Sequence, residues 1–150
     1  MIEIVNNDPD NTENRILYVN VLINEKQYPD AKAILENLPA DVKDSPEVSA
    51  LLGQLEFLAT ANESGADIDT LLKQLADEPD NNELRYQLSS LYITQSNFEQ
   101  ALELFLDIMR RDRKFNDDAG RKGMIKIFEM LGGSGELVSR YRQKMASMLN

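Results

Sequence analysis

The side chains of this sequence leave little room for catalysis. Histidine and cysteine are absent, so the chain has no imidazole base, no thiol nucleophile and no disulfide, and it lacks the commonest metal ligands. Carboxylates, lysines, arginines and one glycine-rich turn remain. We therefore predict no enzyme activity, no cofactor and no metal, and the remaining clusters are candidates for binding alone.

Two of these clusters are similar to ligand sites. Asp117, Asp118 and the aspartates of segment 8–10 could ligate a hard cation, but no twelve-residue loop with a central glycine and a closing glutamate surrounds them. The glycine-rich turn 132–135 opens a predicted helix, as a phosphate cradle does, but it lacks the spacing of a P-loop and follows no strand. We favour helix caps for the carboxylates and a helix–helix turn for the glycines.

Charge argues against nucleic acid as a partner. The chain carries 16 lysines and arginines against 26 acidic residues, a net charge of −10, whereas a nucleic-acid binder needs basic surface. Cations gather in one cluster that is interleaved with Asp112, Asp117 and Asp118. We interpret this basic cluster as solvated or paired within the chain, and a protein-docking patch is the alternative. Its members are Arg110, Arg111, Arg113, Lys114, Arg121, Lys122 and Lys126.

The sequence shows no sign of a membrane segment. No apolar run approaches the roughly 18 residues that span a bilayer. The first residues have neither the basic stretch nor the apolar stretch of a signal peptide. We expect a cytoplasmic protein without a membrane partner.

An internal repeat organises the sequence. Segment 8–11 recurs as segment 78–81, at an offset of 70 residues, which is about twice the 34-residue period of tetratricopeptide repeats. The second copy also resembles the W-x2-L-G-x2-Y…A-x3-F pattern of those repeats. The residues that carry this resemblance are Arg85, Leu88, Ser89, Tyr92, Ala101 and Phe105.

The repeat predicts an all-α fold, a tetratricopeptide-like right-handed solenoid. Ser45 and Pro46 begin a degenerate middle unit as N-cap and first helical residue, while Asp10 and Asp80 are expected to cap the better copies. No segment alternates with the period of a strand. We expect about eight helices in four antiparallel pairs: 12–25 with 28–37, 46–62 with 67–77, 81–95 with 98–112, and 117–131 with 135–149.

The register of the repeats predicts three regions. We expect residues 1–10 to be the remnant of a preceding repeat's helix B and residues 11–115 to hold the tetratricopeptide-like repeats. Residues 116–150 should form a C-terminal capping hairpin. Because a solenoid repeat buries its apolar face only against a neighbour, the apolar residues of segment 1–5 predict a fragment of a longer protein that self-associates through its N-terminal edge.

The end of the sequence resembles a known family. Arg110 to Met124, Ile127 to Gly133 and Leu137 to Lys144 are similar to the carboxyl-terminal region of bacterial thioredoxin-like co-chaperones of the CnoX (YbbN) type. The resemblance extends through the repeat layout over nearly the whole chain. It implies a holdase region that passes unfolded clients to a GroEL-type chaperonin. The thioredoxin domain of that family, with its Cys-x-x-Cys, is missing here.

The predicted binding surface is the concave side of the solenoid, which the first helix of each repeat lines. Its side chains are apolar or neutral and include no lysine or arginine, which suits an extended apolar segment of an unfolded client. The alternative is that its isoleucines pack against neighbouring helices. The consensus positions select Ile16, Asn20, Ile23 and Asn24 in the first copy and Tyr86, Ser90, Ile93 and Thr94 in the second.

The last predicted helix is a second candidate surface. Its apolar stripe should close the solenoid, while the cations and flexible methionines near its end suit docking on an acidic groove of a chaperonin. The simpler interpretation is a solenoid cap alone. The residues of this candidate docking helix are Arg140, Arg142, Lys144, Met145, Met148 and Leu149.

Together these features predict a non-catalytic protein-binding module of a thioredoxin-like co-chaperone. It would hold unfolded clients, dock a GroEL-type chaperonin, or do both. A structural adaptor that assembles a fixed complex through one short linear motif is the alternative.

Overall fold

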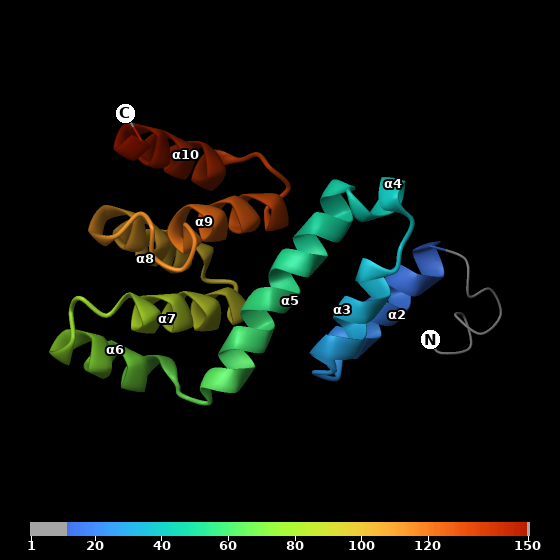
Figure 1. Cartoon of the computed structure of the whole chain (residues 1–150), viewed down its shortest axis with the longest axis horizontal. Coiled ribbons are helices and arrows are strands. Elements are labelled where there is room, and N and C mark those ends of the chain that lie inside the picture. The colour runs from blue at the N-terminus through green and yellow to red at the C-terminus, as the bar shows by residue number, and fades with distance from the viewer. Residues whose placement is uncertain (1–11, 150) are drawn as a thin grey trace. The chain divides into compact units, whose positions relative to one another are not determined.

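The computed structural model describes residues 12–149, apart from the side chain of Ser64, and all regular structure in this range is helical (Figure 1). The all-α prediction is thus confirmed, and eight of the nine helices in this range match the predicted ones to within a few residues. The helices are α2 (Thr12–Asn24), α3 (Tyr28–Glu36), α4 (Ala40–Lys43), α5 (Pro46–Ser64), α6 (Ile68–Asp77), α7 (Asn82–Thr94), α8 (Phe98–Arg111), α9 (Ala119–Met130) and α10 (Glu136–Leu149).

The part of the chain that the structure describes divides into two compact units between Leu55 and Glu56, and the division falls within α5. In the first unit α2 packs against α3. Ala31 is completely buried, and so small a side chain lets two helices approach closely. The core of this unit consists of Val19, Leu22, Ala31, Leu35, Leu38, Val48 and Leu55.

The second unit stacks α6 to α10 and includes the second half of α5 (Figure 1). Its core centres on Phe105 of α8, which has no exposed surface. The ring centroid of Phe105 lies 5.7 Å from that of Phe57 and 5.9 Å from that of Tyr86. Helix α9 approaches α8 through Gly123, where an added Cβ would lie 2.5 Å from the Phe105 ring. Neighbouring helices therefore meet around one aromatic side chain.

Caps and turns explain where several helices begin and end. Ser45 caps α5 as predicted, since its Oγ accepts a hydrogen bond from the Val48 amide at 3.4 Å. Asp80 does not cap α7. The adjacent Asn81 does, because its Oδ1 accepts from the Leu84 amide at 3.1 Å, which leaves Asp80 for an ion pair. Asp10 lies outside the described residues.

The glycine-rich turn connects α9 to α10, as predicted. Gly132 and Gly133 have φ angles of 85° and 77°, which side chains rarely adopt. The Gly133 amide donates to the carbonyl oxygen of Phe128 at 2.8 Å and so ends α9. Within residues 12–149 no helix is long and apolar enough to cross a membrane.

Candidate protein-binding surfaces

The first copy of the predicted groove lies along one side of α2. Ile16 and Ile23 are half-buried against the core of the first unit, while Asn20 and Asn24 are exposed. Sequence analysis missed Leu17, which is 40% exposed and shares its side of the helix with the two asparagines, three and seven residues on. These five uncharged side chains are called the α2 face below.

A pocket of about 310 Å³ opens between α2 and α3 of the same unit. Tyr18 and Ile34 supply apolar walls, and Asn37 lies at the rim with its amide donating to the Ala33 carbonyl at 2.8 Å. Sequence analysis did not find this pocket, because its residues are spread over two helices without a motif. The lining residues are Arg15, Tyr18, Ala33, Ile34 and Asn37.

The second copy of the predicted groove is not an open surface. Ile93 is 4% exposed and belongs to the core of the second unit, in the same cluster as Phe57 of α5. Ser90 is fully buried, and its hydroxyl donates to the Tyr86 carbonyl at 3.0 Å. Only Thr94 is exposed. Packing against neighbouring helices was the alternative that the sequence left open for the isoleucines, and the burial of Ile93 agrees with it.

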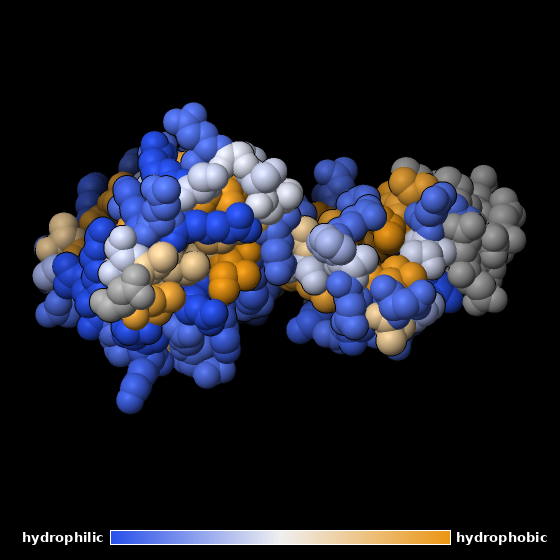
Figure 2. Space-filling model, turned by 90° about the horizontal axis from the view of Figure 1, so that it is seen from above, coloured by the Kyte–Doolittle hydropathy of each residue, from blue (hydrophilic) through white to orange (hydrophobic). Residues whose placement is uncertain are grey.

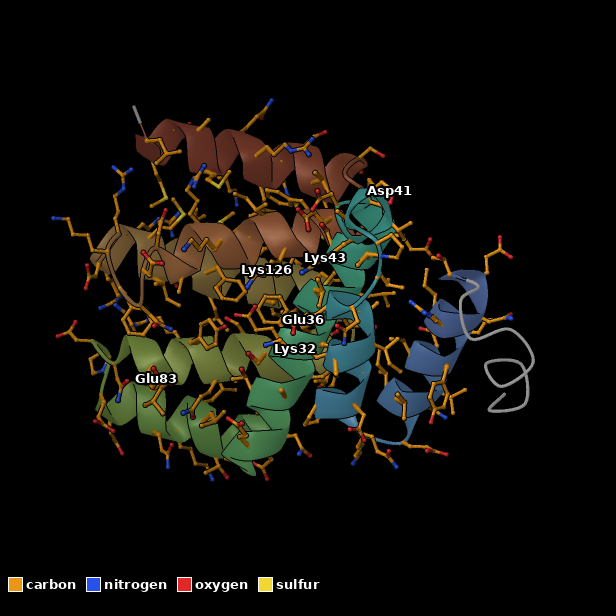
Figure 3. All side chains as sticks on the ribbon, turned by 45° about the vertical axis from the view of Figure 1, so that its right-hand side comes forward. Lys32, Glu36, Asp41, Lys43, Glu83 and Lys126 are labelled. Atoms are coloured by element: carbon orange, nitrogen blue, oxygen red, sulfur yellow. The ribbon has the colours of Figure 1, made fainter. Side chains whose placement is uncertain are left out.

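Glu56 of α5 binds side chains of both α7 and α9. The Tyr86 hydroxyl donates to Glu56 Oε1 at 3.2 Å, and the Lys126 ammonium group donates to Oε2. Burial, and then the Glu56 carboxylate, raise the pKa of Tyr86 above its usual value. Lys126 reaches from α9, where Figure 3 labels it, and its Nζ lies 5.8 Å from the centre of the Phe57 ring.

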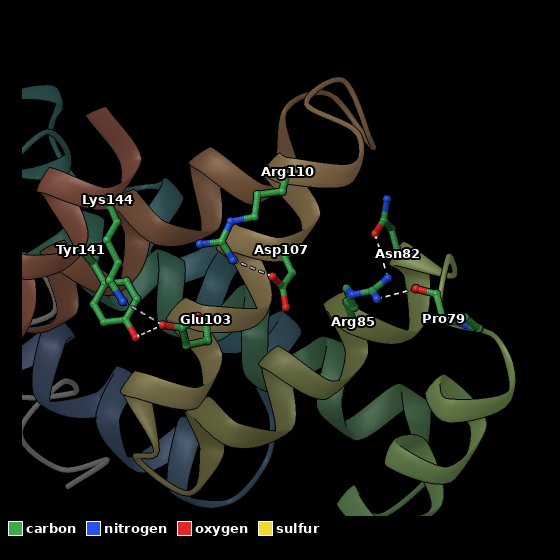
Figure 4. A network of polar contacts seen from close by, with 8 residues as sticks. All are labelled: Pro79, Asn82, Arg85, Glu103, Asp107, Arg110, Tyr141 and Lys144. Atoms are coloured by element: carbon green, nitrogen blue, oxygen red, sulfur yellow. Dashed lines mark hydrogen bonds and ion pairs between the residues drawn. The ribbon is translucent and has the colours of Figure 1, made fainter. Parts of the chain in front are cut away.

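The candidate docking helix α10 already uses two of its three predicted cations within the second unit. Arg140 pairs with Glu99 of α8 at 2.7 Å, and Lys144 pairs with Glu103 at 3.1 Å. The Tyr141 hydroxyl donates to the same Glu103 carboxylate at 2.6 Å (Figure 4). The hydrogen bond from Tyr141, supported by Lys144, holds the pKa of Glu103 below its usual value.

The other residues of the candidate docking helix differ in exposure. The Arg142 guanidinium lies 5.5 Å from the centre of the Phe128 ring. Met145 and Met148 are half-buried against the core, and Leu149 is 38% exposed. These contacts favour the cap interpretation, while the end of α10 still presents an apolar side chain.

The basic cluster is largely paired within the second unit. The side chains of Asp117 and Asp118 pair with Lys122 at 2.8 Å and with Arg121 at 3.6 Å, and Asp118 is the N-cap residue of α9 without a side-chain capping hydrogen bond. Among residues 12–149 no group of three or more acidic side chains is placed to hold a metal ion. Pairing is confirmed for Arg110 with Asp107, Arg111 with Asp80, Arg121 with Asp118, Lys122 with Asp117 and Lys126 with Glu56.

Two family models, each described as tetratricopeptide repeat, match residues 3–55 and 61–150. The chain belongs to the tetratricopeptide-repeat family. It is also similar to the crystal structure of a domain of the protein VP0806, of unknown function, from Vibrio parahaemolyticus RIMD 2210633. The two are 26% identical with a TM-score of 0.51, over 93% of this chain and 81% of that one. No curated protein shows significant similarity to this sequence.

Membership of this family implies protein partners. Stacked helical repeats form extended binding surfaces and are typically interaction modules rather than catalysts. The tetratricopeptide prediction is therefore confirmed by the family models and the helical structure. The relation to thioredoxin-like co-chaperones stays a prediction from the resemblance alone.

Proposed function

We propose that this tetratricopeptide module holds unfolded or partly folded segments of client proteins on the α2 face, as the repeat region of a cytoplasmic thioredoxin-like co-chaperone. The observation that carries the proposal is the exposure of Leu17 beside the exposed amide of Asn20. Leu17 is one of three large hydrophobic side chains at least 38% exposed among the described residues. The asparagines beside it, Asn20 and Asn24, are also exposed.

The chemistry of the α2 face suits variable clients. Apolar side chains gain about 25 cal/mol for each Å² of surface that a client removes from water, whatever the client's sequence. The neutral asparagine amides can donate to or accept from an extended backbone. No lysine or arginine of the face selects a terminal carboxylate. On the face that Figure 2 shows, hydrophobic side chains lie in separate patches among hydrophilic residues.

The proposal is tested by measuring the binding of a permanently unfolded protein. Reduced, carboxymethylated α-lactalbumin carrying a fluorophore is titrated with the chain, and anisotropy gives the Kd. Leu17→Asp should raise the Kd by about tenfold or more, because a charge in the contact opposes apolar burial. Leu72→Asp is the matched control, since Leu72 is 42% exposed on α6. Equal weakening by both variants, or by neither, contradicts the proposal.

The alternative function is a structural adaptor that binds one short linear motif, and the pocket between α2 and α3 favours it. An open pocket of about 310 Å³ with apolar walls suits a side chain of a short linear motif better than a long apolar segment. An adaptor would leave carboxymethylated α-lactalbumin unbound. Tyr18→Ala would then abolish capture of its single partner, whereas Leu17→Asp would not.

We extend the proposal to a GroEL-type chaperonin as a partner that docks on the end of α10. Leu149 is exposed there, next to the half-buried Met148. Deleting residues 146–150 should weaken binding to a purified chaperonin while the thermal midpoint barely moves. If chaperonin binding is unchanged, or falls only in step with the folded fraction, α10 is a cap alone.

A further inference from the structure

The second half of α5 rests on the second unit through a small anchor. Among its described side chains, only Phe57 and Ala61 are buried. They stand four residues apart and therefore on the same side of the helix. Phe57 packs its ring against Phe105 with centroids 5.7 Å apart. The ring of Phe57 and the methyl group of Ala61 are thus the main anchors of this half of α5, as in helices that bind in a groove through a few side chains.

Polar groups on α7 and α9 complement the residue next to this anchor. The Tyr86 hydroxyl and the Lys126 ammonium group both donate to the Glu56 carboxylate. Lys126 also lies 5.8 Å from the centre of the Phe57 ring. The side chain of Glu56 stays 49% exposed and that of Lys126 stays 28% exposed, so water can reach this ion pair.

A short turn at Gly65 separates the end of α5 from α6. Gly65 has a φ of 63° with open space around its Cα, a conformation that costs glycine little. Helix α6 has its own N-cap, because Asp67 Oδ1 accepts from the Thr70 amide at 2.8 Å. The start of α6 therefore does not depend on the end of α5.

We propose that the second half of α5 is a displaceable occupant of a helix-binding face formed by α7, α8 and α9. This face takes an amphipathic helix from another protein that presents a carboxylate next to an aromatic ring, as Glu56 and Phe57 do. Tyr86 and Lys126 bind the carboxylate of the partner helix, and the ring of Phe105 packs against its aromatic ring. The proposal concerns a different surface from the α2 face and does not rest on the holding of unfolded clients.

The probe of the test is a fluorescent peptide with the sequence of residues 46–64. The protein is a variant in which a cross-link can fix α5 to α7. The chain has no cysteine of its own, so Thr60→Cys on α5 and Glu83→Cys on α7 introduce the only two thiols. Thr60 forms a hydrogen bond with Tyr86 and Glu83 interacts with it through its charge, but neither residue is proposed to bind the carboxylate or the ring of the partner helix. A short, chemically cleavable cross-linker joins them, and the cleaved form of the same protein is the matched control.

The cleaved form should bind the peptide about tenfold or more tightly than the locked form, because only a free α5 can be displaced. A peptide carrying Glu56→Gln and Phe57→Ala should not bind either form. Equal binding to the locked and cleaved forms, including no binding to either, overturns the proposal, as does equal binding of the two peptides. Binding of carboxymethylated α-lactalbumin, measured in parallel, reports on the client proposal separately.

Discussion

Arg85 stands where the repeat pattern has tryptophan, and its side chain is only 5% exposed. The guanidinium donates to the carbonyl oxygen of Pro79 and, at 3.3 Å, to Oδ1 of Asn82 (Figure 4). Burial, with a smaller contribution from Arg111, lowers the pKa of Arg85, but an arginine remains charged at neutral pH. A hydrogen-bonding clamp on the turn before α7 thus replaces the packing of an indole ring.

Arg85→Ala should lower the free energy of unfolding by about 2 kcal/mol, because it removes the donor of the buried Asn82 Oδ1 and of the Pro79 carbonyl and opens a cavity. Urea denaturation followed by circular dichroism measures this change. Arg113→Ala is the control, since Arg113 is exposed in the loop before α9. Equal midpoints for Arg85→Ala and the control would show that the clamp contributes nothing.

Gly123→Ala should destabilise the second unit although alanine is the better helix former. The new methyl group would lie 2.5 Å from Cε1 of Phe105, whose ring is held by Phe57 and Tyr86. We expect a loss of about 1–3 kcal/mol, as for overpacked cores, against a gain of about 1 kcal/mol in helix propensity. A raised thermal midpoint would mean that the Phe105 ring moves aside freely.

At the scale of elements, α10 is fastened to α8 by polar contacts as well as by its apolar stripe. Glu103 accepts hydrogen bonds from both Tyr141 and Lys144, and Val138 and Tyr141 are 1% exposed. A carboxylate whose pKa is depressed in the folded state stabilises that state above its unfolded pKa. This stability is lost as the pH falls through the folded pKa.

Glu103→Gln should therefore lower the free energy of unfolding near pH 7 but change it little at acidic pH. The difference in the free energy of unfolding between wild type and variant should narrow once the pH falls below about 4.5, the usual pKa of glutamate, because the pKa of Glu103 in the folded state is lower than this. Urea denaturation at several pH values measures the gap. A constant gap from pH 7 to pH 3 would mean that the ionisation of Glu103 does not stabilise α10.

Elements were more predictable from the sequence than the contacts between them. Helical periodicity is a local signal, and so are the N-cap Ser45 and the glycine-rich turn 132–135. The ends of the helices could therefore be predicted to within a few residues. The single turn α4 was missed because four residues show no periodicity. For Ile93 the sequence left two alternatives, an open groove or packing against neighbouring helices, and its burial in the core of the second unit favours packing. Neither Leu17 nor the pocket beside Tyr18 has a motif that would reveal it.

At the scale of the whole molecule, the two units offer different surfaces. The first carries the α2 face, which is uncharged and partly exposed, and the second carries a face that its own α5 covers. The net charge of −10 is a further property of the chain as a whole. This charge should repel acidic clients at low salt, whereas added salt does not weaken the apolar contact itself.

Raising the salt concentration should therefore strengthen or leave unchanged the binding of acidic carboxymethylated α-lactalbumin. The measurement is the anisotropy titration at about 0.05 M and about 0.5 M salt, where screening differs several-fold. A large loss of affinity at high salt would mean that ion pairs, and not the α2 face, hold the client.

Suppression of aggregation tests the central claim most directly. Light scattering is followed while three unrelated proteins, citrate synthase, malate dehydrogenase and luciferase, unfold on heating with increasing amounts of the chain. A module that holds unfolded segments should suppress the scattering of all three. Leu17→Asp should suppress it less than Leu72→Asp does. Suppression of none of the three, or equal action of the two variants, would contradict the claim that the α2 face holds unfolded clients.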